Sequence, residues 1–323
     1  LARALSLPGL DNADRVSFHG LLNDTSGGEF FDDRGIFRAD DMGLIKLLRA
    51  GQPEPFGPDT VLEVKQAFGS NLAGQVAIEA SVGSPKPRSE AADGAPLPDN
   101  SQRIYVAGDT LLEELFSSGG APPDGDGTIG GMERTRIVDS GHLTFQSFVS
   151  GTADPLDSGR RLFFYDGVLL REIARQGDPG PGEIAPFEIS SFPGLDANIH
   201  DEVVFSVILE RNAVPPDNRT TAIYRWNGGP LTVAVHQGDP APGGNGTFGD
   251  LAHAVFLNNG GQIAFAAEIE GAMPPPPIGN DVGIFVIDSS GTIHQVARNG
   301  QPLAGSTALA PVFLGNERDQ RQR

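Results

Sequence analysis

The chain repeats a short turn motif at nearly constant intervals. Gly-Gln-Pro stands at 51–53 and again at 300–302, Gly-Asp-Pro stands at 177–179 and 238–240, and Gly-Ala-Pro at 120–122 is a weakened copy. The intervals between successive glycines are 69, 57, 61 and 62 residues. Spacing this regular indicates a module of about sixty residues that recurs along the chain.

Each copy of the motif follows two apolar segments joined by a polar turn. Asp166-Gly167, Asn227-Gly228 and Ser290-Gly291 suit tight hairpins, because glycine tolerates the positive φ angles that such turns need. We therefore predict one β-hairpin per repeat. Its first strands are expected at 36–38, 104–106, 162–165, 223–226 and 284–286, and its second strands at 44–49, 111–116, 168–175, 231–236 and 293–298.

A second hairpin recurs after the turn motif. Residues 258–265 read Asn-Asn-Gly-Gly-Gln-Ile-Ala-Phe, and Asn71 and Asn198 begin related segments, whereas only the second half of the pattern survives near Phe145. The 43 glycines and 26 prolines agree with many turns and few helices. Four short strands per repeat without helical periodicity predict an all-β fold, a β-propeller of about five four-stranded blades.

We predict one domain, residues 1–323, and a ring closed by its two ends. Residues 14–22 read as the fourth strand of a repeat, and residues 284–314 read as three strands that lack a fourth. Pairing them would hide both sheet edges of an open propeller. The alternative is an array cut from a longer one, because the apolar pattern stops at Asn316. The expected repeats are 36–82, 104–150, 162–210, 223–270, and 284–314 completed by 14–22.

The repeated segments resemble a known family. Asn71, Gly74, Ala77 and Ile78 follow the pattern of the Asn-x-x-Gly-x-x-Ala-Phe tandem-repeat proteins, bacterial surface proteins with variable anchors (NxxGxxAF, choice-of-anchor). The resemblance covers nearly the whole chain. It implies a secreted or cell-surface repeat protein and no particular biochemical activity. Val138 stands where the pattern has Asn, so this repeat departs most from the family pattern.

Charge and composition restrict the possible partners. The net charge of −19 repels nucleic-acid backbones and anionic membrane surfaces. The chain has no cysteine, and its longest apolar runs are far shorter than the ~20 residues that span a bilayer. We expect a monomeric, extracytoplasmic protein whose leader and anchor are not visible in the sequence, with no membrane-spanning segment and no cofactor.

The repeated polar residues are interpreted as turn residues. Asp178 and Asp239 could line one rim with carboxylates, but Gln52 and Gln301 occupy the same place in other repeats. Either side chain can accept hydrogen bonds from turn amides, so a structural role is favoured over a ligand role. The same interpretation covers Asn71, Asn198 and Asn258.

An acidic loop at 124–128 reads Asp-Gly-Asp-Gly-Thr, with the alternating spacing of calcium loops. The Glu that an EF-hand needs eleven residues after its first Asp is replaced by Thr135. We favour a solvated loop and keep calcium-stabilised adhesion as an open hypothesis.

The sequence does not point to a particular reaction. Nucleophile elbows, phosphate loops, dinucleotide fingerprints and paired zinc-protease histidines are missing. A carbohydrate-active propeller could use Glu63, Glu133, Glu188 or Asp250, although Trp226 is the only Trp that could stack on a sugar. Sequence spacing alone cannot pair these acids. The histidines are His19, His142, His200, His236, His253 and His294, and the Pro-rich stretches are 84–98 and 273–277.

The expected function is a non-enzymatic binding or structural scaffold with an unknown protein or carbohydrate ligand. No catalytic, cofactor-binding or metal-binding residue is assigned. The alternative is a carbohydrate-active enzyme or lectin that uses the central channel.

Overall fold

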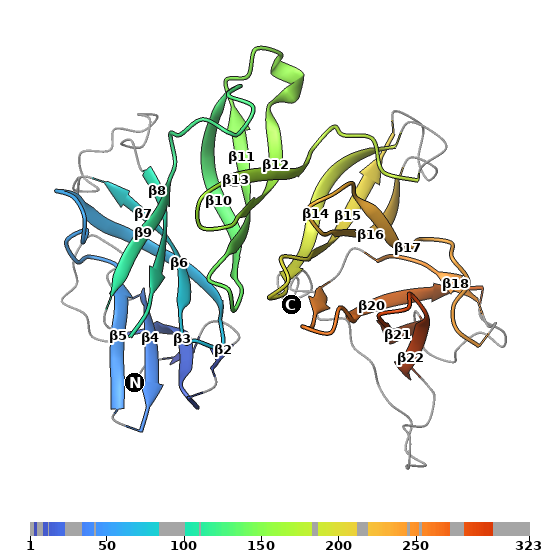
Figure 1. The fold of residues 1–323 in the computed structure, drawn as a ribbon, viewed down its shortest axis with the longest axis horizontal. Coiled ribbons are helices and arrows are strands. Elements are labelled where there is room, and N and C mark those ends of the chain that lie inside the picture. The colour runs from blue at the N-terminus through green and yellow to red at the C-terminus, as the bar shows by residue number, and fades with distance from the viewer. Residues whose placement is uncertain are drawn as a thin grey trace, which may run out of the picture. The chain divides into compact units, whose positions relative to one another are not determined.

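The structure, a computed structural model, is built from strands and turns (Figure 1). The chain forms two compact units, Leu1–Arg175 and Gln176–Arg323. Within the described residues there is one short 3-10 helix (Pro155–Asp157) and no α-helix, so the all-β prediction is confirmed. None of the described helical structure could cross a bilayer. The described residues are 3–4, 9–11, 13–22, 34–41, 43–83, 101–109, 111–182, 187–211, 219–243, 246–251, 254–271 and 281–299.

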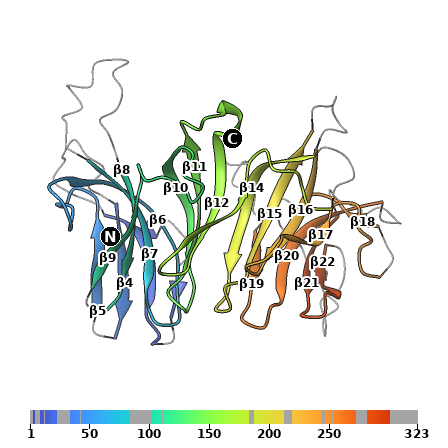
Figure 2. The ribbon, with the colours of Figure 1, turned by 45° about the horizontal axis from the view of Figure 1, so that its top comes forward.

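The first unit contains three antiparallel sheets. The first sheet consists of β1 (Arg3–Ala4), β2 (Gly9–Leu10), β3 (Val16–Leu21), β4 (Arg34–Asp40) and β5 (Gly43–Arg49). The second consists of β6 (Thr60–Ser70), β7 (Val76–Gly83), β8 (Ser101–Ala107) and β9 (Leu112–Ser117). The third consists of β10 (Thr128–Ile137), β11 (Leu143–Ser150), β12 (Gly159–Tyr165) and β13 (Leu170–Arg175), and Figure 2 shows β10, β11 and β12 side by side.

The second unit contains two antiparallel sheets. The fourth sheet consists of β14 (Glu188–Ala197), β15 (Val203–Glu210), β16 (Arg219–Trp226) and β17 (Thr232–His236). The fifth consists of β18 (Thr247–Phe248), β19 (Val255–Leu257), β20 (Ile263–Glu270), β21 (Asp281–Ile287) and β22 (Ile293–Arg298). Both β18 and β19 pair with β20, so a broken first strand replaces the continuous one of the fourth sheet.

The predicted first hairpins all form. They are β4–β5, β8–β9, β12–β13, β16–β17 and β21–β22. The turn glycines Gly167, Gly228 and Gly291 have φ angles of 87°, 89° and 85°, a region that other residues rarely adopt. Turn chemistry in the sequence therefore located three of the five hairpins, β12–β13, β16–β17 and β21–β22.

The sheets do not coincide with the predicted repeats. In the second sheet, β6 and β7 come from the repeat 36–82, whereas β8 and β9 come from the repeat 104–150. Each sheet thus combines the second hairpin of one repeat with the first hairpin of the next. The strand periodicity identifies hairpins but carries no information on which two hairpins share a sheet.

The predicted pairing of residues 14–22 with the last repeat is wrong. β3 lies between β4 on one side and β1 and β2 on the other, so both of its edges are already paired. Its partners are close in sequence, and short loops make such local pairing cheaper in chain entropy than a pairing across the whole chain. The expected partner at 310–314 lies outside the described residues.

The weakened copy of the turn motif is displaced by one residue. Gly119 donates its backbone N–H to Ile129 O (2.8 Å), as Gly51 donates to Val61 O (2.7 Å). Gly119 also has a positive φ of 98°, like Gly51 at 80°. The structural equivalent of Gly51 is therefore Gly119 and not Gly120.

Side chains on the two faces of one strand belong to two different cores. Tyr105 and Ala107 of β8 pack with Ile36 and Leu48 of the first sheet, whereas Ile104 and Val106 pack with residues of the third sheet, including Phe145. Successive strand residues point to opposite faces, so a sheet covered on both sides needs apolar residues at both sets of positions. The near-continuous apolar runs of these strands have this origin.

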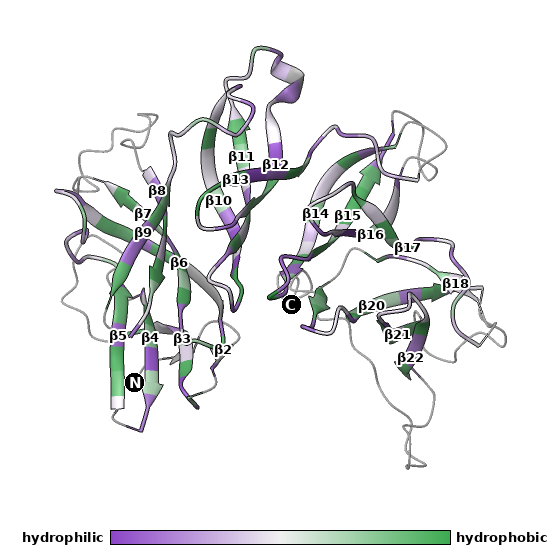
Figure 3. Ribbon diagram, in the orientation of Figure 1, coloured by the Kyte–Doolittle hydropathy of each residue, from purple (hydrophilic) through white to green (hydrophobic). Residues whose placement is uncertain are grey.

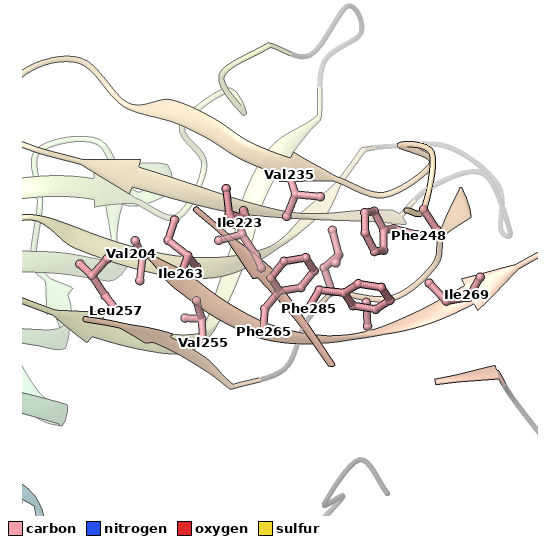
Figure 4. Close-up of a cluster of buried hydrophobic side chains, with 14 residues drawn as sticks. Val204, Ile223, Val235, Phe248, Val255, Leu257, Ile263, Phe265, Ile269 and Phe285 are labelled. Carbon is pink, nitrogen blue, oxygen red and sulfur yellow. The ribbon is translucent and has the colours of Figure 1, made fainter. Parts of the chain in front are cut away.

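The core of the second unit is aromatic (Figure 4). Phe265 and Phe285 are neighbours on paired strands, and Phe248 packs edge-on against Phe285 with ring centroids 4.9 Å apart. Val204 and Ile223 of the fourth sheet contact the same cluster. The fourth and fifth sheets are therefore packed through one buried core.

Apolar residues reach the surface at the outer strands. β5 is largely hydrophobic (Figure 3), yet only Leu48 is fully buried, while Leu44 is 61% exposed. This strand is the outer edge of the first sheet.

Candidate functional site

The asparagines of the repeat organise the turn between the first two strands of a sheet. Asn71 Oδ1 accepts the backbone N–H of Gln75 (2.8 Å), and Asn71 O accepts the N–H of Gly74 (2.9 Å). Asn198 repeats the arrangement with the N–H groups of His200 and Glu202. These bonds support the structural interpretation of both asparagines.

The same asparagines also join neighbouring sheets. Asn71 Nδ2 donates to the carbonyl oxygen of Val138 (3.0 Å), and Asn198 Nδ2 donates to that of Asn258 (3.1 Å). Val138 and Asn258 occupy the equivalent turn of the following sheet. Sequence analysis missed this link, because a side chain that reaches into the next repeat leaves no local pattern.

The turn at Val138 forms without an asparagine. Val138 donates its N–H to His142 O (3.0 Å) and accepts the N–H of Gly141 (2.9 Å), whose φ is 83°. Backbone bonds therefore suffice for the turn, and Val138 lacks only a side chain that could donate.

The acidic loop at 124–128 is held by arginines. Asp124 Oδ2 accepts from Arg161 (3.0 Å) and from Arg175 (2.9 Å). Burial disfavours the charged form of Asp124, but the Asp126 N–H and the guanidinium groups outweigh it, so the pKa of Asp124 lies below its usual value. Asp124 thus has two arginine partners within the fold, and Asp126 Oδ1 accepts the N–H of Ala153 (2.8 Å). The described residues contain no group of three or more His, Asp or Glu side chains that could hold a metal ion.

Arg161 is the centre of a compact ionic cluster. Its side chain is fully buried, and it also contacts Glu172 Oε2 (2.9 Å), while Arg175 contacts Glu172 Oε1 (2.6 Å). A buried charge must be paired, because desolvation alone would cost several kcal/mol. Two arginines and two carboxylates give this cluster a net charge of zero.

The second sheet carries a related cluster. Arg103 forms an ion pair with Glu114, and Tyr105 Oη donates to Glu54 Oε1 (2.8 Å). Glu54 is only 4% exposed, and its Oε2 has no hydrogen-bond partner among the described residues. Burial and the hydrogen bond to Glu54 raise the pKa of Tyr105, so this phenol stays protonated. The ring of Phe56, 52% exposed, stacks on Tyr105.

Glu79 is a buried carboxyl group that no motif or spacing in the sequence singles out. It lies on β7, is 4% exposed and accepts the N–H of Thr135 on β10 (2.7 Å). Burial raises its pKa from 4.5 to about 7, although the Thr135 N–H and Lys65 oppose this shift, and Glu133 adds to it. Glu79 therefore changes protonation state near neutral pH.

The four acids named from the sequence lie two in each unit, Glu63 and Glu133 in the first and Glu188 and Asp250 in the second. Glu63 pairs with Arg34 (3.5 Å), Asp250 pairs with Arg219 (3.5 Å), and Glu133 and Glu188 are exposed. Within the described part of the first unit, Glu63 and Glu133 have different partners. Glu133 also lies near Glu79, and its negative charge helps to raise the pKa of Glu79.

The remaining polar candidates have structural partners. Asp239 Oδ2 accepts the N–H of His236 (2.8 Å), and His294 Nε2 lies 2.7 Å from Asp288 Oδ2. Trp226 is buried and presents no face to a sugar. Gln301, His253 and the Pro-rich stretches 84–98 and 273–277 lie outside the described residues.

These observations define the class of the protein as an all-β repeat protein of consecutive antiparallel sheets with buried ionic clusters. The chain belongs to a family of unknown function (DUF7453), whose profile matches residues 3–310. No curated protein matches the sequence significantly.

Solved structures with a similar fold share little sequence with the chain. The acylaminoacyl peptidase of Pyrococcus horikoshii is 10% identical over 90% of this chain, with a TM-score of 0.50, and this match spans only 38% of the peptidase. Trypanosoma rangeli sialidase (10% identity, 92% and 49% of the two chains, TM-score 0.41) and a PL25 ulvan lyase (10%, 92% and 73%, 0.39) are also similar. The chain thus spans less than two fifths of the peptidase, and the likeness concerns the fold alone.

The link between sheets predicts different effects for two similar asparagines. Replacing Asn by Asp keeps the side-chain oxygen that accepts hydrogen bonds within the turn. It removes the amide NH2 group that donates to the neighbouring sheet. We expect Asn71→Asp to lower the free energy of unfolding by about 2 kcal/mol, because it breaks the bond to Val138 O and leaves a carboxylate nearly buried. Asn258→Asp is the matched control, since Asn258 is exposed and also has Gln four residues later. Its loss should stay below about 1 kcal/mol in urea unfolding. Equal losses would contradict the link.

The raised pKa of Glu79 predicts that the free energy of unfolding falls as pH rises. Its pKa is higher in the folded than in the unfolded chain, so the folded protein binds the extra proton, and the stabilisation present below pH 4.5 is lost between 4.5 and about 7. Glu79 should contribute up to about 3 kcal/mol to the difference between pH 4.5 and 7.5. Glu79→Gln should remove that part of the pH dependence in urea titrations. An unchanged pH profile would show that Glu79 does not titrate in this range.

Proposed function

We propose that the protein is a non-enzymatic, extracytoplasmic scaffold that binds a protein or carbohydrate ligand. The observation that carries the proposal is that the repeated polar residues are engaged in holding the fold. Asn71 and Asn198 link sheets, and Asp124 is bound by two arginines. Residues that already have strong internal partners are poorly suited to bind substrate. The Asn-x-x-Gly-x-x-Ala-Phe resemblance and the acidic composition support a surface location.

The second candidate is a carbohydrate-active enzyme, and one observation favours it. Glu79 is protonated near neutral pH and lies within electrostatic range of Glu133, an arrangement that acid/base catalysis can use. Against this second candidate, Glu79 is buried between β7 and β10, so its carboxyl group is not exposed to a substrate. A general acid must reach the oxygen that it protonates.

Polysaccharide turnover distinguishes the two candidates. We expect the protein to release no reducing ends or unsaturated sugars from a panel of neutral, sulfated and uronic acid polysaccharides, and to bind members of a glycan or protein panel instead. Turnover that disappears in both Glu79→Gln and Glu133→Gln, with folding intact by circular dichroism, would overturn the scaffold proposal. A variant that combines Glu63→Gln, Glu79→Gln and Glu133→Gln provides the background control.

We also infer that the five sheets are blades of one propeller domain, residues 1–323, in a monomer. The support is the succession of four-stranded antiparallel sheets that pack face to face within each unit. A single domain should unfold in one calorimetric transition whose van't Hoff and calorimetric enthalpies agree, at a sedimentation mass of one chain. Two separated transitions would show that the units are independent domains.

A further inference from the structure

Two consecutive sheets carry the same ion pair at the same register. Arg103 of β8 faces Ser117 of β9, and Arg161 of β12 faces Arg175 of β13. The acids correspond as well, because Glu114 pairs with Tyr105 in register just as Glu172 pairs with Phe163. The loops before the sheets have the same length, from Gly51 to Val61 and from Gly119 to Ile129. The second and third sheets can therefore be compared position by position.

The third sheet contains two guanidinium groups. Glu172 gives one carboxylate oxygen to Arg161 and the other to Arg175, and Asp124 bridges the same two arginines. Arg175 lies three residues after Glu172. Its guanidinium balances the second carboxylate, so the two arginines and two carboxylates form a neutral cluster. Its side chain is 26% exposed, so this guanidinium is at the protein surface.

The second sheet has only one of these guanidinium groups. Ser117 replaces Arg175, and Arg103 is the one described hydrogen-bond partner of Glu114, whose side chain is 21% exposed. Glu54 adds a second, buried carboxylate within electrostatic range of Arg103, and its Oε2 lacks a partner among the described residues. Glu54 and Glu114 thus place two carboxyl groups around the single guanidinium of Arg103.

The loop of the second sheet adds an aromatic surface to this charge. Phe56 occupies the loop position that Asp124 holds in the third sheet, counted from Gly51 and Gly119. Its ring is 52% exposed and stacks on Tyr105. A carboxylate beside an exposed ring favours a planar cation, which can pair with the carboxylate and stack on the ring.

We propose that Glu114, Glu54 and Phe56 form a binding site for the guanidinium group of an arginine side chain in a partner protein. The ligand guanidinium takes the place that Arg175 holds in the third sheet, three residues after the acid of the ion pair. The planar fork of Arg matches a carboxylate better than the compact ammonium of Lys, so the site discriminates between them. This inference names a ligand chemistry for the scaffold and rests on that proposed function.

The test exchanges Ser and Arg between the two sheets. The probes are N-acetyl-arginine methylamide, its lysine analogue and its neutral citrulline analogue, each titrated into the full chain and followed by NMR shifts. We expect the arginine probe to bind with a dissociation constant on the order of 10 mM, as befits a single small group, and the citrulline probe at least tenfold more weakly. Ser117→Arg should lower the affinity at least tenfold and raise Tm, because the protein then supplies its own guanidinium.

Arg175→Ser is the matched variant. It places Ser in the third sheet, so we expect a second equivalent of bound arginine probe and a lower Tm that the probe partly restores. Glu114→Gln should weaken binding at least tenfold and lower Tm, because Arg103 loses its ion-pair partner. Binding is then compared below the transition, where circular dichroism shows the variant folded, and this variant tests the site if Ser117→Arg fails to fold.

Two results would overturn the inference. Equal binding of the arginine and citrulline probes would show that charge is not recognised, and unchanged binding in both Ser117→Arg and Glu114→Gln would place the probe elsewhere. Either result leaves the scaffold proposal standing as long as polysaccharides remain intact. Polysaccharide turnover would overturn the scaffold proposal whatever the arginine probe does.

Discussion

Face-to-face packing of successive sheets is the constraint on which the rest of the structure depends. The second sheet lies between the first and third sheets of the first unit and must be apolar on both faces, as β8 shows with Tyr105 on one side and Ile104 on the other. Such packing leaves turns and loops at the strand ends as the places where polar residues can lie. The asparagine turns and the hairpin turns lie there, whereas the ion pairs Arg103–Glu114 and Arg161–Glu172 join residues of neighbouring strands.

Charges near these cores are tolerated only with specific partners. Arg161 is fully buried and has two carboxylates, and a carboxylate at Asp124 is in turn shared by two arginines. Glu79 has no cation at hydrogen-bond distance among its described contacts, and its proton affinity rises instead. The two outcomes show the same electrostatic rule: a buried ionisable group is either paired or neutral.

The sequence predicted local structure well and long-range assembly poorly. Asp166-Gly167 and its equivalents located the hairpins, because positive φ is a property of the turn residues themselves. Nothing local states which hairpins share a sheet, so the predicted repeats were offset by two strands and β3 was assigned the wrong partner. The importance of Glu79 and Arg161 was invisible for a similar reason, since burial depends on the neighbouring sheet. The role of Asn71 was half visible, as its turn bonds are local and its bond to Val138 is not.

A repeat protein separates the residues that maintain the fold from those that can vary. Residues that recur in equivalent positions, such as Asn71 and Asn198, make equivalent bonds, and changing one of them disturbs packing between sheets. A residue that departs from its equivalents without disturbing those bonds can acquire another role. Ser117 is such a departure, because the surrounding Arg–Glu pair is kept while the second arginine is lost. Comparing equivalent positions within one chain therefore identifies candidate binding residues where common catalytic motifs identify none.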